Sequence, residues 1–277
     1  MPLATADIVN RLSSLPPFPK AATKLLRLLD DDLVTIDQLA DVISADPTLV
    51  LRVLHIANSP FYMSPRPIDS IKNAVLVLGL KTIKGLTTAV SIQQGISKIK
   101  PRTSSFDNLA FWKHSYATAL GVGKVLPPEL MSWKEKLYLV GLIHDIGKLI
   151  QAYYWPDSWT AALNIMKSTG ASFAAAEAKV FAANHHDIAA TVCRNWQFPD
   201  YMVDLLVSLA VFDGSPAREY EPSINALHLA HDISHILGLG YPAEDTGDVS
   251  AKAREIANEI GNDLMAEIDY QLQMFAK

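Results

Sequence analysis

Cysteine is almost absent from this chain, and neither sign of charge dominates it. The single cysteine, Cys193, cannot form an internal disulfide, which favours a reducing compartment and predicts a cytoplasmic protein. A net charge of −5 at pH 7 excludes an overall basic surface for binding nucleic acid. Charged residues make up only 19% of the chain and hydrophobic residues 49%, which excludes a disordered chain and allows a sizeable core.

The sequence also lacks a long uninterrupted apolar run. No stretch reaches the roughly 18 residues of a membrane span, and residues 1–15 lack the basic start and apolar core of a secretion signal. The most apolar late segment, residues 224–240, is interrupted by three histidines and Asp232, which would be costly in lipid. We therefore expect no membrane partner.

The strict polar–apolar alternation of half-buried strands is hard to find, and residues that begin or end helices are frequent instead. Asp46-Pro47 places a capping carboxylate before a proline at the first helical position. Thr35 and Ser70 are further N-cap candidates, and Gly79 closes a helix. The sequence therefore predicts an all-α, multi-helical protein.

Longer helices are expected in the second half of the chain. Their predicted ranges are 106–126, 133–154, 173–184, 187–198, 201–212, 225–238 and 249–275.

The segment GLIHDIGKL (141–149), within the predicted helix 133–154, carries the most chemistry. Neutral imidazole and carboxylate suit divalent metals such as Fe, Mn, Zn or Ni. Neighbouring helix positions point about 100° apart, so His144 and Asp145 can share one ion only at that edge of the helix. Gly147 leaves room for a close approach, and Lys148, one turn after His144, could reach a phosphate near the metal.

Two residues are too few for a metal site. Further donors lie on or directly beside other predicted helices: His114 in FWKHS, the His185-His186 pair, and Asp232 in HLAHD. The order His, His-Asp, Asp along the chain makes the pattern more specific than the pair alone.

With these motifs in view, the chain resembles the HD superfamily of helical metal-dependent phosphohydrolases. More closely, it resembles the HDOD family, the HD-related output domain of bacterial signalling proteins. The resemblance covers most of residues 10–240. It rests on LPPFP, ISADPTLVLRVLHIANSPFY, IDSIKNAVLVLGL, FWKHS, GLIHDIGKL, NHHDIAATVCRNWQFPDYM and HLAHDISHILGLG.

The resemblance implies a site and a domain plan. Its metal ligands would be His114, His144, Asp145 and Asp232, holding one divalent ion (Fe, Mn, Zn, Ni or Mg). Lys148 would be the candidate phosphate contact, and His185 would line the same cavity. The expected plan is an N-terminal helical subdomain over 1–100, an HD-like helical subdomain over 101–240, and a helical extension over 241–277.

This sequence also departs from its apparent relatives. Leu209 and Ala210 stand where similar proteins commonly carry two histidines, and the GYP signature of cyclic-di-GMP hydrolysis is absent. Ala189 replaces a common glycine. HDOD proteins are generally regarded as lacking established catalysis. The resemblance therefore implies a non-catalytic signalling module that binds protein partners or a ligand such as a nucleotide. The alternative is a single-metal phosphohydrolase acting on a nucleotide or another phosphoester.

Simpler interpretations stay open at several positions. His144 and Asp145 could be a buried hydrogen-bonded pair that steadies helix packing. Lys148 could be solvated near a helix end. A locally basic region is most simply a solvated face rather than an anion or nucleic-acid site. Its members are Lys72, Lys81, Lys84, Lys98, Lys100 and Arg102.

Overall fold

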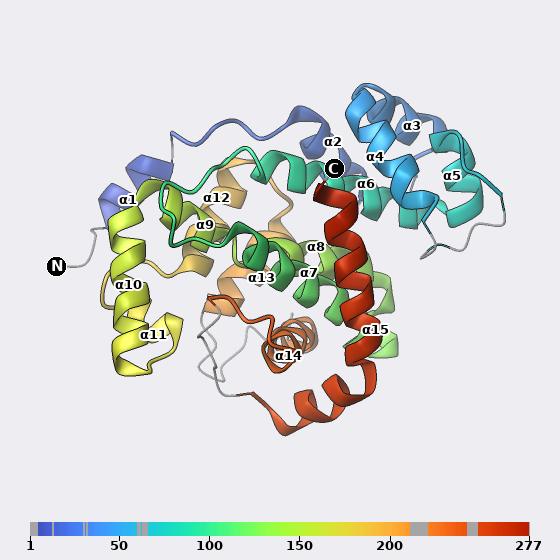
Figure 1. Ribbon diagram of the computed structural model, residues 1–277. Coiled ribbons are helices and arrows are strands. Elements are labelled where there is room, and N and C mark those ends of the chain that lie inside the picture. The colour runs from blue at the N-terminus through green and yellow to red at the C-terminus, as the bar shows by residue number, and fades with distance from the viewer. Residues whose placement is uncertain are drawn as a thin grey trace.

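The computed structural model describes residues 5–12, 14–29, 31, 33–59, 62, 66–210, 221–242 and 249–276. Every element in these ranges is a helix, which confirms the all-α prediction (Figure 1). The first half contains α1 (Thr5–Leu12), α2 (Lys20–Leu29), α3 (Ile36–Ser44), α4 (Pro47–Ala57), α5 (Ile71–Leu78) and α6 (Leu80–Ile96). The second half contains α7 (Asn108–Val125), the short 3₁₀ turn η2 (Pro128–Trp133), α8 (Lys134–Ile143), α9 (Ile146–Tyr154), α10 (Pro156–Thr169), α11 (Phe173–Glu177), α12 (His185–Asn195), α13 (Asp200–Ala210), α14 (Glu221–Ile236) and α15 (Ala251–Ala276).

Short polar side chains begin the N-terminal helices, as their sequence indicates. The Asp46 carboxylate accepts the backbone N–H groups of Thr48 and Leu49 at 3.0 and 3.2 Å, with Pro47 in the first turn of α4. Thr35 forms a complete capping box at the start of α3. Ser70 caps α5, and Gly79 ends it with a positive φ of 88°. These local rules set the helix ends in the first half.

The prediction of one helix over 133–154 is wrong, because the chain turns at His144 and Asp145. Helix α8 ends at Ile143 and α9 begins at Ile146. Asp145 has φ −98° and ψ 8°, outside the helical region. The His-Asp pair therefore lies at a corner, where the 100° rule for a straight helix does not apply.

Gly147 allows the backbones of α9 and α12 to approach closely at this corner. A Cβ atom placed on Gly147 would lie 1.8 Å from the backbone oxygen of His185. Only a residue without a side chain lets α9 approach the first turn of α12 this closely. The close approach brings the His185 region of the chain beside the His-Asp corner.

Helix α7 lies at the centre of the second half. It packs against α8, α14 and α15, while α12 packs against α9 and α13. Helices α3, α4 and α5 gather at one end of the molecule, and α10 and α11 lie at the other (Figure 1). Helix α6 contacts α2 and α8 and so joins the two halves.

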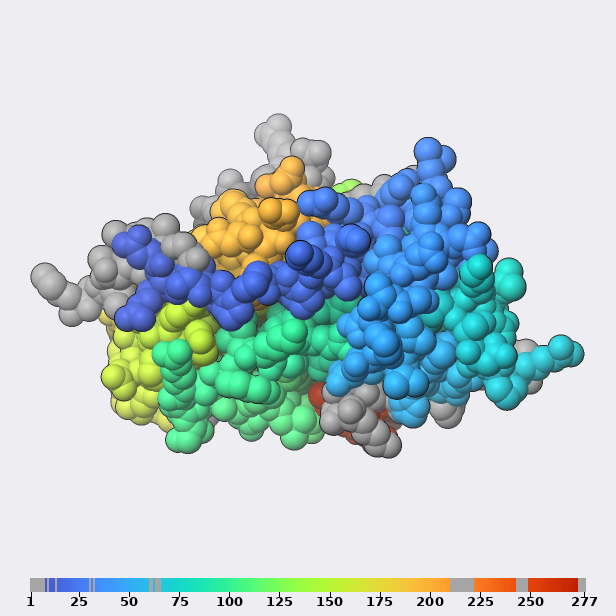
Figure 2. Space-filling model, turned by 90° about the horizontal axis from the view of Figure 1, so that it is seen from above, coloured from blue at the N-terminus to red at the C-terminus, as the bar shows by residue number. Residues whose placement is uncertain are grey.

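The segment between α1 and α2 crosses one face of the molecule and binds the end of α12. Figure 2 shows this N-terminal segment in blue beside the orange surface of the later helices. Phe18 stacks on Trp196 with ring centroids 4.7 Å apart, and the Trp196 indole donates to the carbonyl of Pro16 at 3.1 Å. The LPPFP and WQFP motifs are thus two sides of one contact.

Other sequence expectations have mixed outcomes. Helices α1 and α10 were not anticipated, and α11 is shorter than the predicted 173–184. Lys84 is buried and donates to the carbonyl of Asp31 at 2.8 Å, so this lysine does not belong to a solvated face. Within the described ranges, none of the helices has the length and apolar character of a membrane span.

Candidate metal centre

Two parts of the chain converge in the middle of the second half. His114 comes from the middle of α7, and His144 and Asp145 come from the corner between α8 and α9. Their relative exposures are 0%, 3% and 1%, so this part of the centre is closed to solvent. The structure therefore brings together three of the four ligands that the family resemblance implied.

The hydrogen bonds of the two imidazoles fix which nitrogen carries the proton. His144 Nδ1 lies 2.7 Å from the carbonyl of Gly141, which can only accept, so Nδ1–H donates and Nε2 keeps its lone pair. His114 Nδ1 likewise lies 3.0 Å from the carbonyl of Leu239. It also lies 3.0 Å from Ser234 Oγ, whose own proton goes to the His231 carbonyl at 2.7 Å. Both rings therefore direct an unprotonated Nε2 into the centre.

Those two nitrogens meet at Asp145. The Nε2 atoms of His114 and His144 are 3.2 Å apart, and they lie 3.2 and 3.5 Å from Asp145 Oδ2. Three lone-pair donors then face one another, and such a cluster needs a cation beside it. The donor set fits a divalent transition metal.

Burial keeps the His144 imidazole neutral. It lowers the pKa of His144 to about 3, against the opposing effect of the Asp145 carboxylate. Burial and neighbouring imidazoles also hold the pKa values of His186 and His231 well below the usual range. For Asp145, burial alone would raise the pKa, but contacts with His144, Lys148 and His114 outweigh it and hold the pKa well below normal. Neutral imidazoles beside an ionised carboxylate are the protonation states that metal binding requires.

Lys148 already supplies one cation to this centre. Its Nζ lies 2.7 Å from Asp145 Oδ2 and donates to the carbonyl of Tyr241 at 2.8 Å. Its side chain is 3% exposed, so the interpretation as a solvated lysine is wrong. To contact a phosphate, Lys148 would have to release one of these two partners.

Asp232 does not join the other expected ligands. Its carboxylate accepts the backbone N–H of Ser250 at 3.1 Å, just before α15. The preceding residue, His231, faces the centre instead: ligand atoms of His114, His231 and His235 lie within 4.8 Å of one another. A shift of one residue rotates a helical side chain by about 100°, which separates these two positions.

A second group of donors lies on the other side of Asp145. His185 Nε2 is 3.4 Å from Asp145 Oδ1, and its Nδ1–H donates to Glu177 Oε2 at 2.8 Å. Gln151 bonds the other oxygen of Glu177. His186 completes a potential ligand group with Asp145 and His185. His185 thus lines the centre, with a buried carboxylate orienting its ring.

The sequence interpretation missed His231, His235 and Glu177. The four-residue spacing of His231 and His235 was an available signal, because it places both rings on one helix face. Glu177 had no such signal, since only tertiary packing brings it to His185. Leu209 is buried in α13 and offers no metal ligand, and the side chain of Ala210 lies outside the described residues.

The comparison with known families settles the membership of this chain. A model of the HDOD domain matches residues 15–208. The chain belongs to the HDOD family. The match includes His114, the His-Asp corner and His185, and it ends before α14, which carries His231.

Individual HDOD relatives share the fold at low sequence identity. An HDOD domain protein of unknown function from Geobacter sulfurreducens has a TM-score of 0.78 and 21% identity, with 95% of this chain and 96% of that chain covered. A putative signal transduction protein from Marinobacter aquaeolei VT8 has a TM-score of 0.77 and 20% identity, with 98% and 65% covered. An uncharacterized protein of Treponema pallidum (strain Nichols) is 23% identical over 230 residues, which are 82% of this chain. This chain spans 43% of that relative's length.

Proposed function

We propose that this HDOD protein is a regulatory module that acts by binding, and that its buried centre holds a divalent ion without turning over a substrate. The observation that carries the proposal is the closure of the centre. His114, His144, Asp145 and Lys148 are each at most 3% exposed. Lys148 also ties Asp145 to the Tyr241 carbonyl. Among the described residues, a phosphoester has no free path to such a carboxylate.

The residues that would hold the ion are His114, His144 and Asp145, and His231 shares a potential ligand group with His114. A bound ion would supply Lewis-acid chemistry. Here its main effect would be to cross-link α7, the α8–α9 corner and α14. A set rich in imidazole favours Zn, Fe or Ni over Mg.

The proposed partners are another protein of a signalling pathway or a nucleotide. The name of the Marinobacter protein, a putative signal transduction protein, points the same way at the level of a shared fold. Thermal-shift screening of nucleotides tests the second partner: a nucleotide that raises the melting temperature without being consumed supports sensing.

Assays on purified protein test the absence of turnover. The wild type and Asp145→Asn are incubated with Mn, Fe or Zn and with p-nitrophenyl phosphate, its diester and nucleotides. We expect the same background rate from both proteins. Metal-dependent hydrolysis by the wild type that disappears in Asp145→Asn would overturn the proposal.

That outcome would establish the second candidate, a single-metal phosphohydrolase. The convergence of the two Nε2 lone pairs on Asp145 Oδ2 is the observation that favours it. In this case Lys148 would hold the substrate phosphate, so Lys148→Met would lower the rate. If the protein is a binding module, this variant would show no change in the background rate.

A further inference from the structure

A cavity of about 360 Å³ lies away from the histidine centre, between α6, α7, α8 and α15. Its size is in the range of small-molecule sites. Small residues of two helices line it: Gly85 and Ala89 of α6, and Ala119 and Gly123 of α7. Leu86 and Leu120 add an apolar surface.

Four charged side chains line this cavity: Lys124, Lys134, Glu135 and Glu267. Lys124 binds Glu267 of α15 at 2.7 Å, and Glu135 binds Lys81, which lies outside the lining, at 3.0 Å. The Lys134 ammonium lies over Gly123, 3.7 Å from the position of a Cβ atom there, and has no carboxylate partner in the described part of the chain. Because Lys81 neutralises Glu135 from outside, Lys134 is left as the lining charge without an opposite partner among the described residues.

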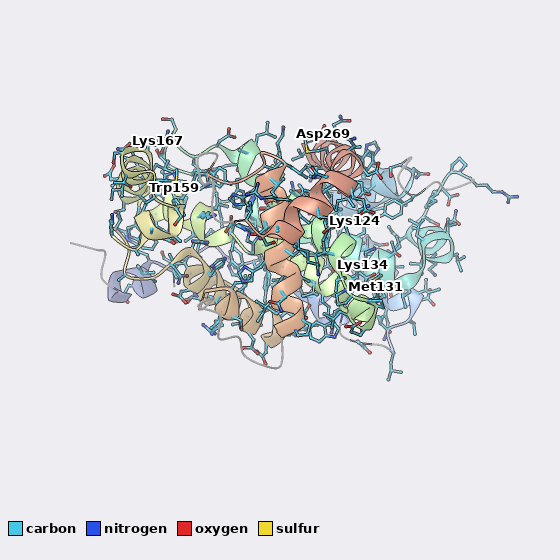
Figure 3. The ribbon with its side chains drawn as sticks, turned by 90° about the horizontal axis from the view of Figure 1, so that it is seen from below. Lys124, Met131, Lys134, Trp159, Lys167 and Asp269 are labelled. Carbon is cyan, nitrogen blue, oxygen red and sulfur yellow. The ribbon has the colours of Figure 1, made fainter. Side chains whose placement is uncertain are left out.

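The 3₁₀ turn η2 leads directly into α8, and the backbone N–H of Lys134 donates to the carbonyl of Met131. The attraction for an anion at this point therefore comes from the Lys134 ammonium. Figure 3 shows Lys124 and Lys134 on the same side of the molecule, far from Trp159.

A second polar feature lines the cavity from α15. Gln271, one turn after Glu267, is only 5% exposed, and its Oε1 has no hydrogen-bond partner among the described residues. An unpaired buried amide is costly, because it has lost water without gaining a partner. Tyr62 and Tyr138 also line the cavity, and burial raises the pKa of Tyr62 to about 12, so its phenol stays protonated. A ligand that donates a hydrogen bond to Gln271 would remove that cost.

We infer that this cavity is a binding site for a small organic anion. The anionic group would lie at Lys134, the apolar body along Leu86, Ala89 and Ala119, and a hydrogen-bond donor at Gln271. Because α6, α7, α8 and α15 all contribute walls, the bound anion would hold the C-terminal helix against both halves of the chain. The site does not depend on the histidine centre and is independent of the function proposed above.

A matched pair of fluorescent probes tests the inference on the full-length protein. 1-Anilinonaphthalene-8-sulfonate carries a sulfonate, an apolar body and an anilino N–H, while N-phenyl-1-naphthylamine is the same body without the sulfonate. We expect the wild type to bind the sulfonate probe about ten times more tightly than the neutral probe, as one charge-assisted contact at a partly exposed site suggests.

Three variants separate the parts of the site. Lys134→Met is expected to weaken the sulfonate probe about tenfold and leave the neutral probe unchanged. Gln271→Leu is expected to weaken both probes, since both carry the N–H. Ala89→Leu fills the cavity and is expected to abolish the binding of both. Lys252→Met, an exposed lysine of α15, is the control and should change neither.

Each other outcome counts against the inference. If the wild type does not bind the sulfonate probe, or if Ala89→Leu still binds it with wild-type affinity, the cavity is not the site. If Lys134→Met binds both probes as the wild type does, the site does not select anions. Circular dichroism of each variant shows whether it has folded. A misfolded Ala89→Leu variant leaves the decision to Lys134→Met and Gln271→Leu, which change side chains at the edge of the cavity.

Discussion

Asp145 is the residue on which the centre depends. One of its oxygens faces Lys148, His114 and His144, and the other faces His185. The carboxylate is buried, so its charge must be balanced inside the protein. Lys148 provides a permanent part of that balance, and a metal ion would provide the rest.

Removing the Lys148 charge should therefore be costly. Lys148→Met leaves a buried carboxylate short of a cation, and we expect the free energy of unfolding to fall by about 3 kcal/mol. Urea denaturation in the presence of a chelator measures it. Lys179→Met, at an exposed position, is the control and should stay within roughly 0.5 kcal/mol of the wild type. A loss below about 1 kcal/mol in Lys148→Met would show that Asp145 does not depend on this lysine.

Adjacent residues of α14 should differ in their effect on metal binding. His231 faces the centre, whereas Asp232 bonds the backbone of Ser250. We expect His231→Ala to weaken Zn²⁺ binding at least tenfold, as loss of a ligand or of its support typically does. Asp232→Ala should leave the affinity unchanged. Competition with a chromophoric chelator gives both constants, and the reverse order would restore Asp232 as the ligand.

The buried histidines predict acid sensitivity of the metal-free protein. The pKa of His144 is about 3 in the folded state and near 6.5 when unfolded, so only the unfolded chain takes up its proton between these values. Stability is therefore lost as pH falls below about 6.5, at roughly 1 kcal/mol per pH unit for this residue. The lowered pKa values of His186 and His231 act in the same direction, and that of Asp145 adds a further loss below pH 4.

Denaturation at pH 7, 6 and 5 with a chelator present measures this slope. In His144→Gln the slope should decrease by about the contribution of one proton. An unchanged slope would mean that His144 is not the buried neutral group that the structure shows.

At the scale of helices, ends that are fixed by neighbouring residues can be predicted from the sequence, whereas ends that are fixed by tertiary packing cannot. Thr35, Asp46 and Ser70 act on backbone groups two or three residues away, so their caps could be predicted. The break at His144-Asp145 could not, because the apolar pattern continues through it from α8 into α9. What fixes the break is the packing of Gly147 on His185, which are distant in the sequence.

The candidate site shows the same division. The HDOD motifs identified His114, His144, Asp145 and His185 as neighbours, and the structure places them together. The choice between His231 and Asp232 depends on how α14 is rotated about its axis. That rotation is set by its packing against α7, which a motif does not encode.

Two Gly→Ala substitutions should lower the free energy of unfolding by different amounts. Gly147→Ala places a Cβ against backbone, and we expect a loss of about 4 kcal/mol or a failure to fold. Gly170 ends α10 with φ 67° and open space around it, so Gly170→Ala should cost only about 1 kcal/mol, through backbone strain. Chemical denaturation of both variants measures the difference. Similar losses would contradict the close approach at Gly147.

For the whole molecule, α15 should behave as part of the cooperative fold. Ile268 is 1% exposed, and its neighbour Asp269 is exposed. We expect Ile268→Ala to lower the free energy of unfolding by about 3 kcal/mol and Asp269→Ala by less than roughly 0.5 kcal/mol. A single calorimetric transition in both variants supports one cooperative unit. A separate early transition in Ile268→Ala alone would show that α15 unfolds independently.

The boundary of the HDOD match at residue 208 has a consequence for how such proteins can diverge. His231, Ser234 and the carbonyls of Leu239 and Tyr241 all touch the centre from beyond that boundary. The matched segment thus carries His114, His144, Asp145 and His185, and the described residues of the last quarter of the chain pack over them. Substitutions in that last quarter would open or seal the same candidate ligands while every matched motif stays intact, so we expect HDOD proteins with identical motifs to differ in access to the centre.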